Sequence, residues 1–390
     1  MNYSAFIMMN LIFWLILIIV FYSYLFYPLV LLMLAHLFPK SRKIDDNFMP
    51  FVSVIVAAYN EEDNIEAKVE NFKKLDYPKS KIEMLFGSDG SSDNTNALLK
   101  SREKNNIRCF YYEQRNGKAA VLNKLVKEAR GEILIFSDAN TIYDHDAIKM
   151  LVRHFADDEV GGVCGQLNLV NPNENVGGKG ELLYWKYENI LKELEGRIKT
   201  VLGANGAIYA LRNELYYPLP TNKVIMDDFL IPLKAVEFGK DVVYDRLASG
   251  SETTSSSIEG EFQRKIRIGA ANFNALVEIK NLLSPLKGFV AFGLWSHKIF
   301  RWFSPFLLIA AFILNINLLT NFTYQVTMAI QLLFYSSAAV GYFFNRNNFT
   351  MKLFSYPLYF SAINLALAIG FIKFITGTQK PAWSRVERAQ

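Results

Sequence analysis

Cysteine and excess charge are both scarce in this chain of 390 residues. Its two cysteines, Cys109 and Cys164, are too few for a disulfide framework or a cysteine zinc site, so we predict that both are reduced core thiols. The net charge of +5 is too small and too scattered to indicate a nucleic-acid partner. Long disordered or low-complexity tracts are excluded as well, because 31 Phe and 20 Tyr exceed what a disordered chain carries.

Asp, Glu, Lys and Arg are absent from one long apolar stretch, Ala5 to Phe38. A helix needs about 20 such residues to cross the hydrocarbon core of a bilayer, so this stretch predicts a transmembrane helix. The alternative is a signal peptide, but the basic start, the short apolar core and the small-residue cleavage site are missing. Lys40, Arg42 and Lys43 follow directly, which by the positive-inside rule places the next segment in the cytoplasm and the N-terminus outside.

Long apolar runs are then missing until about residue 300. The predicted organisation is an N-terminal transmembrane helix over 1–40, a cytosolic domain over 41–280, an interfacial amphipathic segment over 281–302, about three transmembrane helices over 303–377 and a polar tail over 378–390. Three crossings from inside would leave the tail outside, whereas Lys380, Arg385 and Arg388 favour the inside. The last crossing and the side of the tail therefore stay open.

Alternating strand and helix patterns fill the polar part of the chain. Val52–Ala58 is a β-branched run that predicts a buried strand, and Asn60 follows as a helix cap. The unit recurs, with strands predicted at 82–87, 109–113 and 132–136. This alternation predicts an α/β domain with a mostly parallel, Rossmann-like sheet covered by helices on both faces. After Gly161 the pattern is mixed, and we interpret this part as the acceptor-facing half.

Polar residues gather where the predicted strands end. In parallel sheets ligands bind beyond the carboxyl ends of the strands, and these ends carry Asn60, Glu61, Asp89 and Asp138. Asp138 and Asn140 offer a carboxylate and an amide oxygen two residues apart. Such hard ligands suit Mg²⁺ or Mn²⁺ bridging phosphates, although a motif this short also occurs by chance.

Three further segments are candidates for charge chemistry. Arg115 and Lys118 stand at the start of a predicted helix, where a diphosphate would bind. Asp227 and Asp228 begin another helix, either as acids favoured by its dipole or as a general base with an orienting neighbour. The run Gln263–Arg267 is either a solvated basic face near the membrane or a grip on phosphate or acceptor.

In this order, the segments resemble those of family 2 glycosyltransferases, inverting enzymes of GT-A fold that use nucleotide-diphosphate sugars. The resemblance is strongest to the membrane-bound branch of cellulose, hyaluronan and poly-N-acetylglucosamine synthases. It covers the chain from Val52 to Trp302 and depends on VAAYNEE, SDGSSDNT, RNGKAAVLN, FSDANT, GANGAIYALR, MDDF, QRKIR and SHKIFRW. A set of motifs in this order is far more specific than any single one.

The resemblance implies a GT-A nucleotide-diphospho-sugar transferase fold and a role for each matching residue. Ala57, Asn60, Glu61 and Asp89 would hold the nucleoside, Lys118 the diphosphate, Asp138 and Asn140 a divalent Mg or Mn ion, Asp228 with Asp227 the catalytic proton, and Arg264 and Arg267 the acceptor or diphosphate. The implied donor is a nucleotide sugar, with UDP as the expected nucleotide, and the implied acceptor is lipid-linked or a glycan. The implied location is the cell membrane, as a multi-pass protein with a cytoplasmic catalytic domain, membrane lipids around it and export subunits as further partners.

Two departures from the family pattern bear on function. Asn140 stands in place of the second acid of the metal motif. Aligning the Gln-x-x-Arg-Trp motif on Arg267 puts Arg264 in place of Gln and Ile268 in place of Trp. Because that Trp stacks on the acceptor sugar in processive enzymes, the sequence favours transfer of one or a few sugars over a processive polysaccharide synthase.

Two rival functions come from other classes. A membrane-tethered nucleotide sensor without turnover would not need an acid at Asp228. A transporter with a regulatory domain is disfavoured, because Lys373 is the one charged residue in the three C-terminal apolar blocks, whereas transporters mark their route with intramembrane charges.

Overall fold

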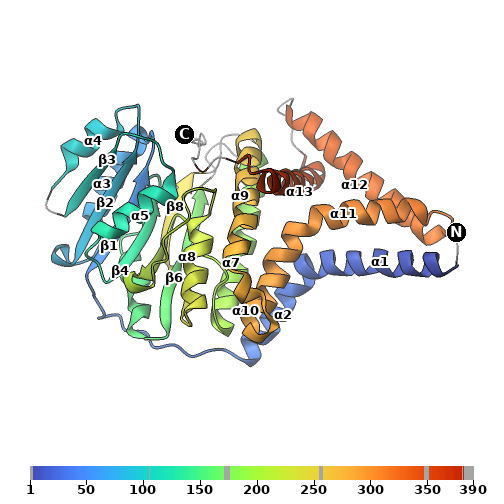
Figure 1. Cartoon of the computed structure of the whole chain (residues 1–390), viewed down its shortest axis with the longest axis horizontal. Helices are drawn as coiled ribbons and strands as arrows, with labels where there is room; N and C mark the ends of the chain where they lie inside the picture. Colours follow the sequence, from blue (N-terminus) through green and yellow to red (C-terminus); the bar gives the residue numbers. More distant parts are fainter. Residues whose placement is uncertain are drawn as a thin grey trace.

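Beyond the apolar N-terminal helix, the chain folds around one eight-stranded sheet (Figure 1). The computed structural model describes residues 3–104, 106–170, 176–253, 258–346, 351–379 and 381. The strands are β1 Val52–Ala58, β2 Ile82–Asp89, β3 Ile107–Tyr112, β4 Ile133–Asp138, β5 Ile142–Tyr143, β6 Val160–Val170, β7 Tyr209–Arg212 and β8 Asp241–Thr253. Their order in the sheet is β3-β2-β1-β4-β7-β6-β8-β5.

The sheet is mixed, and its parallel part comes first in the sequence. β1 pairs in parallel with β2 and β4, and β2 with β3, as the strand and helix alternation predicts. β7 then runs antiparallel to both β4 and β6, while β6 and β8 are parallel. The predicted α/β class is confirmed, and the mixed pattern after Gly161 corresponds to the antiparallel insertion.

Helices cover both faces of the sheet. They are α3 Glu62–Lys74, α4 Thr95–Arg102, α5 Lys118–Glu128, α6 Ala147–Val152, α7 Val176–Ile198 and α8 Asp227–Glu237, whereas α9 Ile258–Glu278 packs on α7, α8 and α13 Lys352–Thr376. Short helical turns lie at η2 Lys79–Lys81, η3 Arg153–Ala156, η4 Asn213–Leu215, η5 Lys280–Leu283 and η6 Pro285–Lys287. Along β1, Ile55 packs into one core with α5 and α8, whereas Val54 and Val56 pack into the other with α3 and α6. This alternation follows from the two-residue period of a strand. Cys109 and Cys164 are free and buried, as predicted.

Asn60 does not cap α3, and this sequence prediction was wrong. Its backbone has a φ of 54°, in the left-handed region that Asn tolerates better than most residues. Its side-chain Oδ1 accepts a hydrogen bond from the Ser92 N–H at 2.9 Å. Asn60 therefore ties the loop after β1 to the loop after β2.

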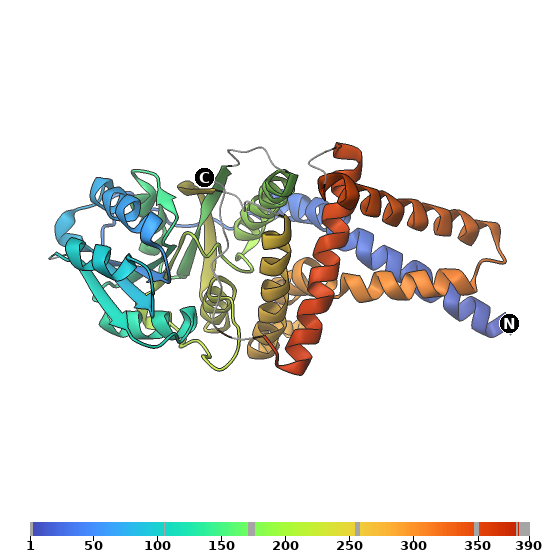
Figure 2. The ribbon, with the colours of Figure 1, turned by 90° about the horizontal axis from the view of Figure 1, so that it is seen from above.

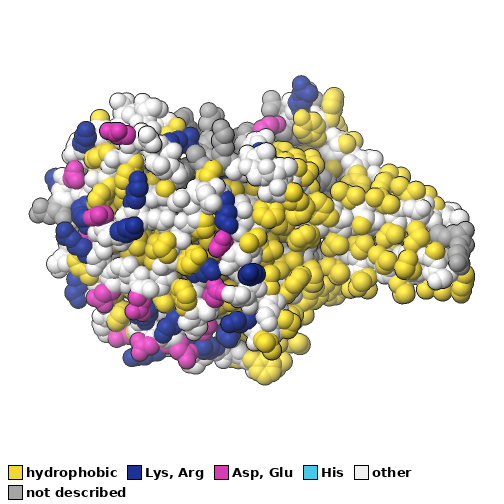
Figure 3. All heavy atoms as spheres, viewed as in Figure 1, with side chains coloured by type: hydrophobic (Ala, Val, Ile, Leu, Met, Phe, Trp, Pro, Cys, Tyr) yellow, Lys and Arg dark blue, Asp and Glu magenta, His cyan; other side chains and the backbone are white. Residues whose placement is uncertain are grey.

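Four helices in the described part of the chain are long and apolar enough to cross a membrane: Tyr3–Leu37, Phe289–Asn317, Phe322–Arg346 and Leu353–Thr376. The first comprises α1 Tyr3–Phe21, a π-helical turn η1 Tyr22–Phe26 and α2 Tyr27–Leu37, and the others comprise α10 Phe289–Gly293, a second π-helical turn η7 Leu294–Ile299, α11 Phe300–Asn317, α12 Phe322–Arg346 and α13 Lys352–Thr376. Figure 3 shows hydrophobic side chains over these helices and charged ones over the sheet domain.

The predicted interfacial segment is helical over much of its length and continues into α11. Its location at the lipid headgroups stays a prediction. The charged tail residues Lys380, Arg385 and Arg388 lie outside the described residues.

A buried polar network fastens the sheet domain to the apolar helices. Arg301 donates to the Ser23 carbonyl in η1 at 3.1 Å and pairs with Glu188 of α7 at 3.0 Å. His297 of η7 lies 2.6 Å from Glu195 of α7. These contacts join α7 to the apolar helices, and loss of one partner would leave the other as a buried, unpaired charge.

Candidate active site

A cleft of about 770 Å³ opens at the carboxyl ends of β1 and β4 and extends between α7, α8 and α9. Among the residues that the sequence singles out, those lining this cleft are Ala57, Glu61, Lys118, Asp138, Asn140, Asp227, Asp228, Arg264 and Arg267. Parallel strands bring Ala57 and Asp138 together directly, because they are register partners in β1 and β4. The sheet therefore gathers groups from distant motifs at one edge.

Asp89 and Asn60 are not among the residues that line the cleft. Asp89 is fully buried, and its carboxylate accepts hydrogen bonds from the Asn116 N–H at 2.8 Å and the Gly117 N–H at 2.9 Å. Gly117 has a φ of +89°, which favours glycine at this turn. Asp89 thus holds the loop that precedes α5, and its direct contact with a nucleoside stays a prediction.

Lys118 joins two acids at the centre of the cleft. Its Nζ lies 2.8 Å from Asp138 Oδ1 and 3.1 Å from Asp227 Oδ1. Burial would lower the pKa of Lys118, but the two carboxylates raise it above its ordinary value. Lys118 is therefore a fixed positive charge between the end of β4 and the start of α8.

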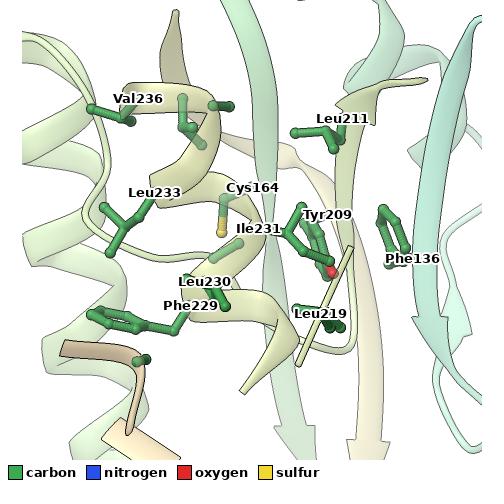
Figure 4. Close-up of a cluster of buried hydrophobic side chains, with 14 of the residues drawn as sticks. Phe136, Cys164, Tyr209, Leu211, Leu219, Phe229, Leu230, Ile231, Leu233 and Val236 are labelled. Atoms are coloured by element: carbon green, nitrogen blue, oxygen red, sulfur yellow. The ribbon is translucent and has the colours of Figure 1, made fainter. Parts of the chain in front are cut away.

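The hydrophobic core holds the first turn of α8 in place (Figure 4). Phe229 and Leu230 pack into the core beneath the acids, and Tyr209 stacks on Phe136 with ring centroids 4.6 Å apart. The Tyr209 hydroxyl donates to Asp227 Oδ2 at 3.0 Å. Asp227 is thus engaged on both oxygens, by Tyr209 and by Lys118.

Asp228 lies in a different environment from its neighbour. Its Oδ2 accepts one hydrogen bond from the Gly206 N–H at 2.9 Å, within the GANGAIYALR segment. Burial and, next, the nearby Asp227 carboxylate raise the pKa of Asp228 to about 6, although Lys118 opposes the shift. A carboxylate with this pKa is matched to proton transfer near neutral pH.

The basic residues of α9 line the same cleft as these acids. Burial lowers the pKa of Arg267, as does the neighbouring Arg264, whereas Asp138, Asp227 and Asp228 act in the opposite direction. Arg264 is bonded to Glu261 on its own helix, at 2.6 and 3.0 Å. Arg267 therefore adds a second positive charge, besides that of Lys118, to the lining of the cleft.

The residues at the end of β4 fit a divalent ion that is bound partly by the protein and partly by a diphosphate. In the described part of the chain, no three His, Cys, Asp or Glu side chains cluster as a self-sufficient metal site. Mg²⁺ commonly takes only one or two protein carboxylates and completes its shell with phosphate oxygens and water. Asp138 and Asn140 both line the cleft, which meets this smaller requirement.

Several residues of the site carry no signal in the sequence. Lys68 of α3 is buried and donates to Ser137 Oγ and to the Thr141 carbonyl, each at 2.6 Å, so it supports the turn that carries Asp138. Burial lowers the pKa of Lys68 to about 7. Its helix has an ordinary amphipathic pattern, and nothing in that pattern distinguishes this lysine from a solvated one.

Aromatic residues also reach the cleft from α7 and from the start of α11. Tyr184 and Trp185 of α7 and Trp302 of α11 line it together with Ile268. Trp302 is buried and packs edge-on against Phe229, with ring centroids 5.4 Å apart. Trp302 lies at the end of the segment that the sequence predicts to be interfacial, and the fold brings this residue to the cleft.

Comparison with known proteins yields one family and one architecture. Residues 53–213 match the family model "Glycosyl transferase family 2". The poly-beta-1,6-N-acetyl-D-glucosamine synthase of Staphylococcus aureus is 26% identical over 253 residues, which cover 64% of this chain and 60% of that protein. The synthase of the same name from Staphylococcus epidermidis is 26% identical over 319 residues, covering 78% of this chain and 74% of that protein. The match to the first of these relatives thus spans about three fifths of its length.

The architecture extends to the membrane helices. A mannosyltransferase of Pyrobaculum calidifontis, solved with GDP-Man and Mn²⁺, superimposes with a TM-score of 0.74 over 95% of this chain and 100% of that one, at 20% identity. At this identity the likeness concerns the fold alone. Residues 53–213 are thus similar to glycosyltransferases of family 2, and the fold is that of a GT-A glycosyltransferase joined to long apolar helices.

Proposed function

We propose that the protein is an inverting glycosyltransferase that moves a sugar from a nucleotide-diphosphate sugar to a hydroxyl of a glycan acceptor in polysaccharide synthesis. The observation that carries this proposal is Asp228, a cleft carboxylate with a raised pKa, whose chain neighbour Asp227 pairs with the fixed cation Lys118 at 3.1 Å. A nucleotide sensor without turnover would have no use for such a base. We propose UDP as the nucleotide, and the names of the staphylococcal relatives favour N-acetylglucosamine as the sugar.

In the proposed reaction, the acceptor oxygen attacks the anomeric carbon as the bond to the diphosphate breaks. Asp228 accepts the proton of the acceptor hydroxyl, and the diphosphate leaves with the electron pair of the broken bond. Attack from the side opposite the leaving group inverts the anomeric configuration. Lys118 and Arg267 lie on the cleft wall and offset the negative charge of the departing diphosphate.

Asp138 and Asn140 would hold a divalent ion, Mg²⁺ or Mn²⁺, together with the diphosphate. When bound, such an ion neutralises charge on phosphate oxygens. Lys118 already lies 2.8 Å from Asp138, so this lysine would contact the same diphosphate. Ala57 and Glu61, at the end of β1, would contact the nucleoside.

We also propose that the protein lies in the cell membrane as a multi-pass protein with its catalytic domain in the cytoplasm. Lys40, Arg42 and Lys43 follow the first apolar helix, and by the positive-inside rule they favour this side. Nucleotide sugars are supplied there as well. Membrane lipids and export subunits are the further partners that this placement implies.

The rate of transfer is expected to fall as the pH is lowered through about 6. The pKa of Asp228 is raised to about 6, so below this pH the carboxyl is protonated and cannot accept the acceptor proton. The measurement is the initial rate with saturating donor between pH 4.5 and 8, at constant ionic strength. A rate that stays flat down to pH 4.5 would contradict the assignment of Asp228 as the base.

The length of the product distinguishes two candidate functions, synthesis of a long glycan and transfer of a few sugars to a lipid-linked acceptor. Trp185, Tyr184 and Trp302 in the cleft offer aromatic faces that could hold a growing glycan, as polymer synthesis requires. Ile268, in place of the stacking Trp of processive enzymes, favours instead the addition of one or a few sugars to a lipid-linked acceptor.

The names of the staphylococcal relatives favour polymer synthesis over the shorter products that Ile268 indicates. We therefore expect a ladder of long products when purified protein receives one radiolabelled nucleotide sugar, chosen by mass spectrometry of products from a donor panel. Replacing Trp185 with Ala should shorten this ladder while leaving the first transfer largely intact, because stacking holds the glycan between cycles. Products of only one or a few sugars from the parent protein would establish the second candidate.

A further inference from the structure

α13 differs in direction from the other long apolar helices. Figure 1 shows α1 and α11 along the long axis of the molecule, whereas α13 is seen nearly end-on. In the view from above, α13 runs across that axis at the border between the sheet domain and the other apolar helices (Figure 2). Its length and composition would allow a crossing, but its orientation does not match that of α1 and α11.

Both ends of α13 lie on the side of the catalytic domain. The Tyr324 hydroxyl donates to Asn10 Oδ1 of α1 at 2.6 Å, so the start of α12 lies beside the N-terminal half of α1. From this far end α12 returns toward the catalytic domain, where α13 begins (Figure 1). Beyond the end of α13, Pro381 lines the catalytic cleft itself. The chain thus enters and leaves α13 on the same side.

A close backbone contact joins α13 to α9. A Cβ atom added at Gly370 would come within 2.7 Å of the Ile266 carbonyl and 3.0 Å of the Gly269 Cα. Only a bare glycine allows this approach. Since the next residue after Ile266 is Arg267, which lines the cleft, α13 supports α9 from behind the catalytic site.

The face of α13 that packs on no other helix is apolar. Leu353, Tyr356, Leu365, Ile372 and Ile375 are 71, 58, 56, 57 and 65% exposed, respectively. The sequence has no acid or base from Leu353 to Ile372, whereas Arg346 and Lys352 precede this stretch and Lys373 and Lys380 follow it. Apolar side chains flanked by cations are typical of a helix in the headgroup region of a membrane.

We propose that α13 is an interfacial helix that lies along the leaflet on the catalytic side, with the acyl chains and headgroups of that leaflet as its partner. Of the four apolar helices in the described ranges, α1, α11 and α12 cross the bilayer. Lys380, Arg385 and Arg388 then follow α13 on the same side as Lys40, Arg42 and Lys43, in agreement with the positive-inside rule. Through α9, the lipid surface positions Arg267 at the cleft; this role of Arg267 in transfer rests on the proposed function.

Single cysteines test the topology, because the native Cys109 and Cys164 are buried and the parent protein serves as the background control. Three exposed positions are informative: Lys127 on α5, Thr320 between α11 and α12, and Thr378 after α13. With a membrane-impermeant maleimide on intact cells and on inverted vesicles, we expect Lys127→Cys and Thr378→Cys to react from one side and Thr320→Cys from the other. Reaction of Thr378→Cys from the side of Thr320→Cys would overturn the proposal. If the whole protein were reversed, the three would exchange sides together, which contradicts the cytoplasmic placement and leaves the inference standing.

Depth measurements test the lipid contact directly. Nitroxide labels at Leu353, Leu365 and Ile372 of α13 are compared with labels at Val326, Leu333 and Val340, which are exposed on α12. In vesicles of the purified full chain, accessibility to oxygen and to a polar nickel complex reports depth. We expect one shallow depth along α13 and a maximum near Leu333 along α12. A maximum in the middle of α13, or labels that are fully accessible to the nickel complex as in water, would overturn the proposal.

Discussion

Replacing Asp228 with Asn is expected to lower the rate of sugar transfer by about 10² to 10⁴, the usual range for loss of a general base. Donor affinity should stay close to that of the parent. Asn keeps the size of the side chain and can still accept the hydrogen bond from the Gly206 N–H, so the change removes little besides the proton acceptor. The measurements are the transfer rate from radiolabelled donor and, separately, donor binding by calorimetry.

We also expect the Asp228→Asn variant to be at least as stable as the parent at neutral pH. The pKa of Asp228 in the folded protein, about 6, lies above the ordinary carboxyl value, so ionisation at neutral pH costs the folded state free energy. Asn removes this cost, and the unfolding temperature at pH 7 should therefore not fall. This result would exclude misfolding as the reason for lost transfer.

Asp227→Asn is the matched comparison. Asp227 pairs with Lys118 and accepts a hydrogen bond from Tyr209. Its replacement should therefore displace Lys118, which we expect to bind the diphosphate, and should weaken donor binding as well as transfer. If Asp228→Asn transferred sugar at the parent rate, the assignment would be wrong, and Asp227 would become the candidate base.

Replacing Asp138 with Ala is expected to abolish the dependence of donor binding on divalent metal, together with most of the transfer. Asp138 is the one charged ligand in its motif, because the second position is Asn140. Without its carboxylate, the diphosphate and water alone would have to hold the ion. Calorimetric titration of a nucleoside diphosphate with and without Mg²⁺ or Mn²⁺ measures this directly.

Asp89→Asn is the control for this experiment. Asp89 accepts backbone hydrogen bonds from Asn116 and Gly117, so its replacement should weaken nucleotide binding through the loop before α5. Its response to metal should match that of the parent, since the side chain is buried and does not line the cleft. Identical metal titration curves for Asp138→Ala and the parent would show that Asp138 does not bind the ion.

The strands and the order of the motifs could be read from the sequence. Val52–Ala58 is β1 residue for residue, and the runs that predict β2 and β4 end within two residues of the observed strands. A buried parallel strand must be apolar on both faces, so its signal is continuous and local. The same geometry places Ala57 beside Asp138, because parallel strands bring their carboxyl ends to one edge.

The four apolar helices were recognisable for the same kind of reason. A helix in lipid must be apolar over its whole length, so consecutive residues in the sequence reveal it. The family resemblance to glycosyltransferases is confirmed for residues 53–213. Composition and local pattern thus predicted the fold class and the long apolar helices, and the resemblance supplied the roles of the candidate site residues.

Tertiary structure alone decided how these candidates differ from one another. Asp227 and Asp228 are equivalent in sequence, but Tyr209 and Lys118 engage the first while the second lies partly buried with a raised pKa. Each difference arises from partners far away in the chain. Asn60 was predicted locally as a helix cap, but its left-handed backbone and its bond to Ser92 in another loop give it a different role.

The direction of α13 relative to the other apolar helices also could not be predicted from hydropathy. A spanning helix and an interfacial helix can have the same mean hydropathy, because both expose apolar side chains to acyl chains. What distinguishes them here is the contact between Gly370 and Gly269, together with the return of Pro381 to the cleft. The sequence by itself determined which segments enter the membrane region, and packing against α9 decided how the last of them lies there, because such packing depends on residues about a hundred positions apart.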